Sequence, residues 1–500
     1  MSRAVWILVG VKLVFHVCTA GRYGIFRDEL YYLACSEHLA WGYVDQPPLI
    51  ALVAWIARHV FGESLYGLRF IPAVAGAATV WLTAKLAAEM GGGRFAQIMA
   101  AVAVIATPIY LILHHWLTMN AFEPLIWVAC AWCIVRAISR AEPRYWIYFG
   151  LLAGLGLENK YTTAFFLAAV AVGLVLTSSR QFLKSGELWI GVVAAALIFL
   201  PNFIWLVLHH FPFLELMHNI RQGHRDVFRG PVGFIEDQVQ FMNPVLAPLW
   251  MGGLLWLLIV SRARQFRLLG VAYLVMLATF ILLRGKNYYL ASFYPILFAA
   301  GSVGFDSLTT QHARWTRIVY VGLVSIATAI LAPLFSPILS PERVIAYSDW
   351  LGMAPPKTEN QNTGRLPQYF ADEFGWEEMV REVARAFHAL PADLQAKTAI
   401  FANSYGQAGA IDFFGPRYGL PKAICNHQNY WLWGPRDYDG DSVIVLGSDG
   451  SGDREHFKSV EVIGRVDHPY SRRDEVYNIF LCRGMTTDLR KAWPQLKHWN

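Results

Sequence analysis

The stretch LWIGVVAAALIFLPNFIWLVL, residues 188–208, decides the fold class. It carries no charged side chain, and a helix of this length, rising about 1.5 Å per residue, spans the hydrocarbon layer of a bilayer. Similar apolar runs recur from residue 4 to residue 335, at 4–20, 69–89, 95–113, 121–139, 145–158, 161–177, 246–260, 268–283, 288–305 and 316–335. This pattern predicts an all-α polytopic membrane protein with about 11–13 membrane helices.

The composition agrees with a membrane protein. Apolar residues make up 55% of the 500 residues and charged residues only 16%, whereas a soluble domain has roughly 25% charged residues. Aromatic residues reach 14%, which is typical of chains with many side chains at membrane interfaces. These values exclude a disordered protein, a coiled coil and a single soluble enzyme domain. The net charge of +6 is modest, and we attribute it to topology rather than to a nucleic-acid partner.

Basic residues in the short connections predict the orientation. If the N-terminus is cytoplasmic, five basic connections fall inside, as the positive-inside rule requires: 90–94, 140–144, 178–187, 261–267 and 306–315. The loop 21–68 then lies outside, and residues 1–335 form the membrane domain. Eleven crossings leave residues 336–500 outside as well. We therefore expect a multi-pass protein of the cell (inner) membrane whose polar side chains converge on the outer, periplasmic face.

Residues 336–500 differ in sequence pattern from the membrane domain. A helical pattern at 376–390 precedes strand-like runs at 398–402, 442–447, 459–463 and 476–481. This order predicts a small extracytoplasmic α/β domain. Its two cysteines, Cys425 and Cys482, could pair if the domain faces an oxidising compartment, and the sequence leaves this open.

The loop 21–68 holds two predicted helices and the first candidate functional residues. Residues 27–41 form an amphipathic pattern that could lie flat on the membrane surface, and residues 48–61 predict a re-entrant or interfacial helix. Helix capping explains one carboxylate of the pair Asp28 and Glu29. Capping does not explain why Asp45 returns another carboxylate to the same loop, so catalysis and capping both remain open on these residues alone.

Several short motifs follow one another along the chain. The first is Asp28-Glu29 followed by Asp45-Gln46-Pro47-Pro48-Leu49. The others, in chain order, are Gly67-Leu68-Arg69-Phe70, residues 118–124, residues 154–160, Lys286-Asn287-Tyr288-Tyr289-Leu290 and Tyr294-Pro295. The ordered set resembles glycosyltransferase family 39, which contains the protein O-mannosyltransferases and the aminoarabinose transferases, and it is specific for the family although no single element is. In the C-terminal part, Tyr405-Gly406-Gln407-Ala408-Gly409-Ala410 is similar to bacterial members.

The resemblance implies the GT-C fold and the transfer of a hexose or pentose from a polyprenyl-phosphate carrier to an extracytoplasmic protein, lipid or polysaccharide. Inverting transfer needs one carboxylate that takes the acceptor proton. We expect Asp28 to be this base. Glu29 would be its partner, either orienting the acceptor or taking part in metal binding.

The departing lipid phosphate needs fixed cations. Lys286 is the first candidate, followed by Arg69, Lys160 and Arg284, although interfacial snorkelling also explains a cation at each of these helix ends. Tyr288 and Tyr289 are either walls of the sugar pocket or interface residues. His114, His115 and the basic cluster at 221–229 are explained by loop solvation, although the cluster's loop could fold over the donor.

The remaining predicted substrate-binding residues are Asp45, Gln46, Asn120 and Glu123. Two of them depart from the family pattern. Gln46 replaces a charged or imidazole side chain, and Asn120 stands where many relatives carry Asp, a change for which Glu123 could compensate one helical turn later. Both changes suggest an altered substrate. No metal ligand set is predicted, and a divalent cation stays an open alternative.

Two other classes of protein compete with the transferase. A transporter or flippase of lipid-linked sugars would often show inverted repeats with broken helices, and no such repeat is visible in the sequence. A non-catalytic protein that recognises a cell-wall polymer through its external domain is the third possibility. The sugar and the acceptor cannot be read from the sequence.

Overall fold

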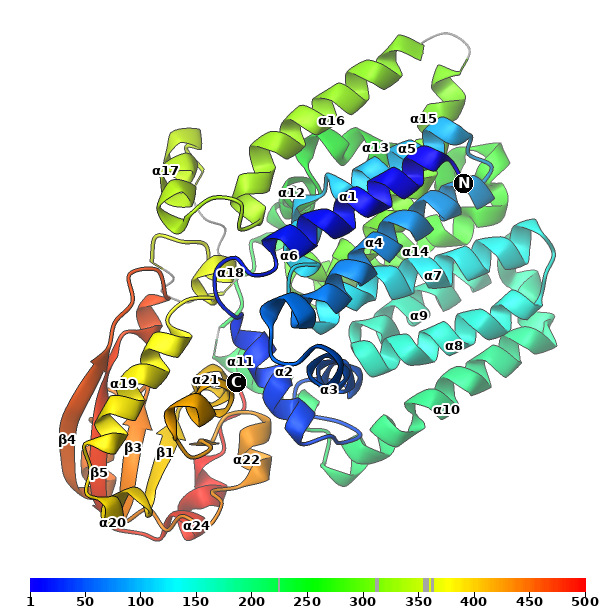
Figure 1. Cartoon of the computed structure of the whole chain (residues 1–500). Coiled ribbons are helices and arrows are strands. Elements are labelled where there is room, and N and C mark those ends of the chain that lie inside the picture. The colour runs from blue at the N-terminus through cyan, green and yellow to red at the C-terminus, as the bar shows by residue number, and fades with distance from the viewer. Residues whose placement is uncertain (224, 311–313, 354–358, 361–363) are drawn as a thin grey trace.

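All the predicted apolar runs are helical in the computed structural model, which describes the chain except residues 224, 311–313, 354–358 and 361–363 (Figure 1). The long helices are α1 (Arg3–Thr19), α4 (Leu65–Glu89), α7 (Met119–Ser139), α8 (Arg144–Asn159), α9 (Thr162–Leu176), α10 (Gly186–Leu208), α13 (Ala247–Ile259), α14 (Arg267–Leu282), α15 (Tyr294–Thr309) and α16 (Arg314–Phe335). The run 95–113 is divided into α5 (Arg94–Ile105) and α6 (Pro108–Leu113). The break falls at Thr107, which is extended (φ −84°, ψ 117°) because the following proline disfavours a helical residue there.

Length and hydropathy identify fewer membrane crossings than the sequence predicts. Within the described residues, six helices are long and apolar enough to cross a membrane, or up to eight if each of two bent helix pairs is one span. Helices α1 and α8 have 17 and 16 residues and fall below that length. The helical segments are therefore confirmed, and the eleven crossings stay a prediction.

Glycines allow the membrane helices to pack closely. A Cβ at Gly150 of α8 would lie 2.1 Å from the carbonyl oxygen of Gly191 in α10. A Cβ at Gly253 of α13 would lie 2.2 Å from the carbonyl oxygen of Leu297 in α15, and one at Gly301 only 2.0 Å from that of Leu249. Small residues at such crossings let backbones approach, which drives helix association in lipid.

Shorter helices connect the membrane helices to the C-terminal domain. They are α2 (Arg27–Glu37), α3 (Leu49–Phe61), α11 (Pro212–Gln222), α12 (Gly230–Phe241), α17 (Pro341–Leu351) and α18 (Gln368–Ala371). Helix α3 buries Ile50 and Ala54 but exposes Leu52 and Val60, as an interfacial helix does. The prediction that α2 lies on a membrane surface is wrong. Its buried side chains belong to one core cluster with residues of α3, α4 and the C-terminal domain.

The C-terminal domain lies at one end of the helical part, far from the N-terminus (Figure 1). Its sheet has the strand order β2-β1-β3-β5-β4, with β1 parallel to both neighbours and β5 antiparallel to both of its own. The strands are β1 (Thr398–Ala402), β2 (Ile424–Cys425), β3 (Ser442–Leu446), β4 (Phe457–Val466) and β5 (Tyr477–Met485). The helices are α19 (Trp376–His388), α20 (Ala392–Gln395), α21 (Tyr405–Phe414), α22 (Asn429–Trp433), α23 (Asp453–His456) and α24 (Leu489–Ala492). The predicted α/β domain is thus confirmed, with β2 as a strand that the sequence pattern missed.

The two cysteines of this domain are free and buried. Cys425 lies on β2 and Cys482 on β5, and β1 and β3 stand between these strands. Neighbouring strands are about 4.8 Å apart, whereas a disulfide needs Cα atoms within about 7 Å. The pairing that the sequence left open is therefore absent.

Candidate functional site

A cavity of about 220 Å³ lies where the helical part meets the C-terminal domain. One wall is apolar and contains Ile109, Ile112 and Phe241. Another part of the lining, the charged wall, contains Arg27, Asp28, Arg225, Lys286 and Glu359. Of the residues predicted to bind or act on substrate, the cavity brings together Asp28, Asn120, Lys286 and Tyr288.

A wider surface groove of about 520 Å³ lies between α2 and α3. Its charges are already paired, because Arg58 contacts Glu37 at 2.9 Å and Glu63 at 2.8 Å. We therefore take the smaller cavity, where cations and carboxylates face each other beside an apolar wall, as the candidate site.

Asp28 and Glu29 are neighbours in the first turn of α2, yet their carboxylates have different hydrogen-bond partners. Glu29 accepts a hydrogen bond from the backbone N–H of Phe26 at 2.9 Å, so it is the capping carboxylate. Asp28 faces the cavity, and one of its oxygens accepts a hydrogen bond from the hydroxyl of Tyr405 at 2.9 Å. Burial raises the pKa of Asp28, although Arg27 and the Tyr405 hydroxyl oppose this effect.

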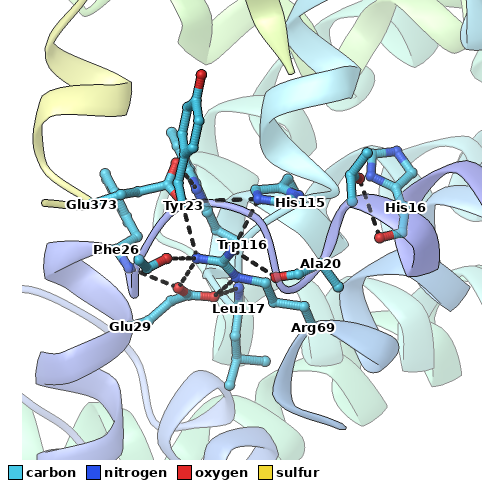
Figure 2. Close-up of polar contacts among 12 residues, drawn as sticks. His16, Ala20, Tyr23, Phe26, Glu29, Arg69, His115, Trp116, Leu117 and Glu373 are labelled. Carbon is cyan, nitrogen blue, oxygen red and sulfur yellow. Dashed lines mark hydrogen bonds and ion pairs between the residues drawn. The ribbon is translucent and has the colours of Figure 1, made fainter. Parts of the chain in front are cut away.

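Arg69 belongs to a buried cluster (Figure 2) and does not line the cavity. Its guanidinium donates to both carboxylate oxygens of Glu29, at 3.1 and 2.7 Å, and contacts Glu373 at 3.3 Å. It also lies 2.9 Å from the Nε2 of His115. The cluster ties α2 and α4 to the segment before α19. The placement therefore does not fit the phosphate role expected of Arg69 or the catalytic role expected of Glu29.

Two cations on the charged wall share one carboxylate. The ammonium group of Lys286 lies 2.8 Å from Glu359 and 3.3 Å from Asp226, and Arg225 contacts Glu359 at 3.1 Å. Burial alone would raise the pKa of Glu359, but Lys286 and Arg225 hold it below its ordinary value. Arg225 belongs to the basic cluster at 221–229, so that loop does reach the cavity.

Lys160 lies behind the cavity wall and holds part of it in place. Its ammonium group donates to Asn120 at 2.8 Å and to Glu123 at 3.3 Å. The same group lies 4.6 Å from the ring centre of Tyr289 and 5.5 Å from that of Tyr288. Glu123 thus supplies the carboxylate that Asn120 lacks, but for Lys160 rather than for the cavity.

Three further predicted residues lie elsewhere. Asp45 accepts a hydrogen bond from Tyr31 at 2.9 Å, and burial raises its pKa to about 7. Gln46 is fully buried, with its amide nitrogen 3.8 Å from the sulfur of Cys35. The guanidinium of Arg284 lies 5.7 Å from the ring centre of Phe228. None of the three lines the cavity.

Most of the cavity lining was not predicted to bind or act on substrate, including Arg27, Tyr405, Arg225 and Glu359. Arg27 directly precedes the motif pair and could have been found from that position. Tyr405 opens a motif that was noticed but given no role. Arg225 was noticed only as part of the basic cluster at 221–229, Glu359 was not singled out, and the fold brings the two together. Within the described part of the chain, no group of three His, Cys, Asp or Glu side chains could hold a metal ion.

Comparisons with known proteins agree with the predicted family resemblance. Residues 45–205 match the family model described as dolichyl-phosphate-mannose-protein mannosyltransferase. The chain is 26% identical over 318 residues to undecaprenyl phosphate-alpha-4-amino-4-deoxy-L-arabinose arabinosyl transferase 1 of Pseudomonas fluorescens (strain Pf0-1), an alignment that covers 58% of this chain and 54% of the relative. The chain therefore spans about half the length of that curated relative.

Two solved structures share the fold. ArnT from Cupriavidus metallidurans, bound to undecaprenyl phosphate, gives a TM-score of 0.62 at 13% identity and covers 96% of this chain and 98% of its own. The oligosaccharyltransferase of Archaeoglobus fulgidus gives a TM-score of 0.52 at 14% identity, covering 90% of this chain and 68% of its own. The fold predicted from the sequence motifs is confirmed.

Proposed function

We propose that this GT-C protein, which is similar to glycosyltransferase family 39, transfers a sugar from a polyprenyl-phosphate donor to an acceptor on the outer side of the inner membrane. One observation carries the proposal. A carboxylate, Asp28, lies in the same cavity as the cations Arg27, Arg225 and Lys286, beside an apolar wall at the end of a membrane helix bundle. A base, a phosphate site and a lipid path are the three parts that such a reaction needs.

The cations of the cavity would bind the phosphate of the donor. Lys286 and Arg225 already hold an anion, the carboxylate of Glu359, at 2.8 and 3.1 Å, and charge-assisted contacts of this kind suit a phosphate group. Arg27 is buried, and its Nε has no hydrogen-bond partner among the described residues. The donor phosphate would lie between these groups, which would stabilise the charge that develops as it leaves.

The carboxylate of Asp28 would remove the proton of the acceptor. An acceptor oxygen attacks the anomeric carbon while the bond from that carbon to the phosphate oxygen breaks, and the phosphate leaves with the bonding electrons. Asp28 takes the acceptor proton, and burial makes it a stronger base than an exposed aspartate. Attack from the face opposite the phosphate inverts the configuration, which requires only one carboxylate.

The apolar wall would contact the polyprenyl chain of the donor. Ile112, Leu113 and Phe241 line the cavity on the side of the membrane helices, where a polyprenyl chain could remain in an apolar environment while its phosphate reaches the cations. The acceptor is a protein, a lipid or a polysaccharide of the cell envelope.

A transfer assay tests the proposal. The purified protein is incubated with radiolabelled polyprenyl-phosphate sugars and with envelope extract from a deletion strain as acceptor. We expect Asp28→Asn to lower transfer by about 10²–10⁴-fold, the usual contribution of a general base, while binding of undecaprenyl phosphate is retained. Lys286→Met is expected to weaken that binding.

The assay also separates the competing functions. Transfer that is undiminished in Asp28→Asn would remove this residue as the base. Movement of labelled donor across liposomes without product would instead indicate a transporter.

A further inference from the structure

We propose that Tyr405 of the C-terminal domain is a positioning residue for Asp28, so that this domain forms part of the catalytic machinery. The inference rests on the proposed function, because it assigns to Tyr405 the task of orienting the base. It goes further in one respect: a residue about 380 positions away in the sequence, on a separate domain, controls the carboxylate.

The contact is specific to one oxygen. The Tyr405 hydroxyl donates to the Oδ1 of Asp28 at 2.9 Å. Among the described residues, no side chain or backbone group donates a hydrogen bond to the other oxygen, Oδ2. One oxygen is therefore held by tyrosine, and the other is free to accept the proton of an incoming hydroxyl group.

The tyrosine itself has little freedom. Its ring lies 4.7 Å from that of Tyr31 and 5.0 Å from that of His427, and only 8% of the residue is exposed. The guanidinium of Arg27 lies 4.5 Å above the same ring, a cation–π contact. Tyr405 therefore positions the two charged residues that begin α2, one through its hydroxyl and the other through its ring.

Local sequence explains why Tyr405 reaches α2. Ser404 caps α21 by accepting from the backbone N–H of Gln407, whose side chain accepts in return from the backbone N–H of Ser404. Two glycines then allow close contact between α21 and α2. A Cβ at Gly409 would lie 2.9 Å from the carbonyl of Leu30, and one at Gly406 would lie 2.7 Å from the side chain of Arg27.

The hydroxyl of Tyr405 has an effect on pH dependence that packing does not have. By donating to the charged carboxylate it lowers the pKa of Asp28, against the larger effect of burial. The other groups that face Asp28 are Arg27, Tyr32 and Asp45 of the first loop, Glu359 and Asp372 of the segment before α19, and Arg225 and Lys286 across the cavity. All of them remain when only the hydroxyl is removed.

The experiment compares two Tyr→Phe variants of the full chain. Tyr405→Phe removes the hydroxyl that reaches Asp28. Tyr430→Phe, in the same domain, removes the hydroxyl of another buried tyrosine, which donates to Asp412 at 2.8 Å and does not line the cavity. For each, transfer is measured against pH, together with the melting temperature and KM for the donor.

We expect the acid limb of the kcat profile of Tyr405→Phe to move upward by about one pH unit, a tenfold change in the ionisation constant. We also expect kcat to fall about tenfold, while KM for the donor stays the same. The profile of Tyr430→Phe should match that of the unchanged protein, even if its melting temperature falls.

An unshifted profile in Tyr405→Phe would overturn the inference. If Asp28→Asn is inactive in the same assay, Asp28 remains the proposed base and only the role of Tyr405 is refuted. If Asp28→Asn is fully active, the proposed base fails and the inference fails with it.

Discussion

At the scale of single residues, two carboxylates compete for one guanidinium. Arg69 contacts Glu29 at 2.7 Å and Glu373 at 3.3 Å, and all three side chains are almost completely buried. One cation cannot compensate two buried anions. Burial, with Glu29 adding to it and Arg69 opposing it, raises the pKa of Glu373 to about 8. Glu373 is therefore the member of the cluster that stays protonated near neutral pH.

This protonation predicts a pH-dependent stability. The pKa of Glu373 is about 8 in the folded chain against 4.5 in the unfolded one, so the folded state holds the proton more tightly. The stabilisation is complete below pH 4.5 and is lost as the pH rises through about 8. Glutamine keeps the neutral form at every pH. We expect Glu373→Gln to match the unchanged protein in melting temperature at pH 5 and to exceed it at pH 9.

Melting curves of both proteins across this range, followed by tryptophan fluorescence in detergent, check the prediction. Asp349→Asn is the control, because its ion pair with Arg365 is about 70% exposed on both sides and contributes little. Parallel curves for Glu373→Gln and the unchanged protein would show that Glu373 is ionised throughout.

Motifs predict which residues matter better than they predict what each one does. Asp28 and Lys286 were found from the sequence and line the cavity. Glu29 and Arg69 belong to the same motifs but bind each other. Successive residues of a helix point about 100° apart, so a pair such as Asp28 and Glu29 must divide between two surroundings. Which of them faces the cavity depends on the segments that pack against α2, and the motif does not predict these segments.

At the scale of elements, two neighbouring glycines of α13 test how closely this helix packs against α15. A Cβ at Gly253 would lie 2.2 Å from the carbonyl oxygen of Leu297, whereas a Cβ at Gly252 meets nothing within 4 Å. We expect Gly253→Ala to separate the helices and to cost about 1–3 kcal/mol, as overpacking does. Gly252→Ala should leave the melting temperature unchanged. Equal effects from the two variants would contradict the crossing.

The elements that sequence predicts well are those whose burial follows from their own composition. A run such as 188–208 must be helical in lipid whatever its neighbours are, and α10 covers it. Helix α2 was placed on the membrane surface because its amphipathic pattern fits that position too. It lies instead in one core cluster with Trp376 and Ala408 of the C-terminal domain, and no local pattern reveals packing between segments so distant in the sequence.

At the scale of the whole molecule, the proposal requires the cavity and the C-terminal domain to lie on the side of the membrane opposite the basic connections. Gly452 and Gly186 are suited to test this, because a side chain added at either meets nothing within 4 Å. Gly452 lies in the C-terminal domain, and Gly186 begins α10 in a connection predicted to be cytoplasmic. Of the native cysteines, only Cys18 is exposed, so Cys18→Ser provides the background.

We expect a membrane-impermeant maleimide to label Gly452→Cys in intact spheroplasts, and to label Gly186→Cys only after the membrane is permeabilised. The physical reason is the positive-inside rule, since the connection that contains Gly186 also carries Arg180 and Lys184. Labelling of both variants before permeabilisation would place the basic connection outside. Labelling of Gly186→Cys alone would place Asp28 in the cytoplasm, where the donor of a periplasmic transferase does not present its sugar.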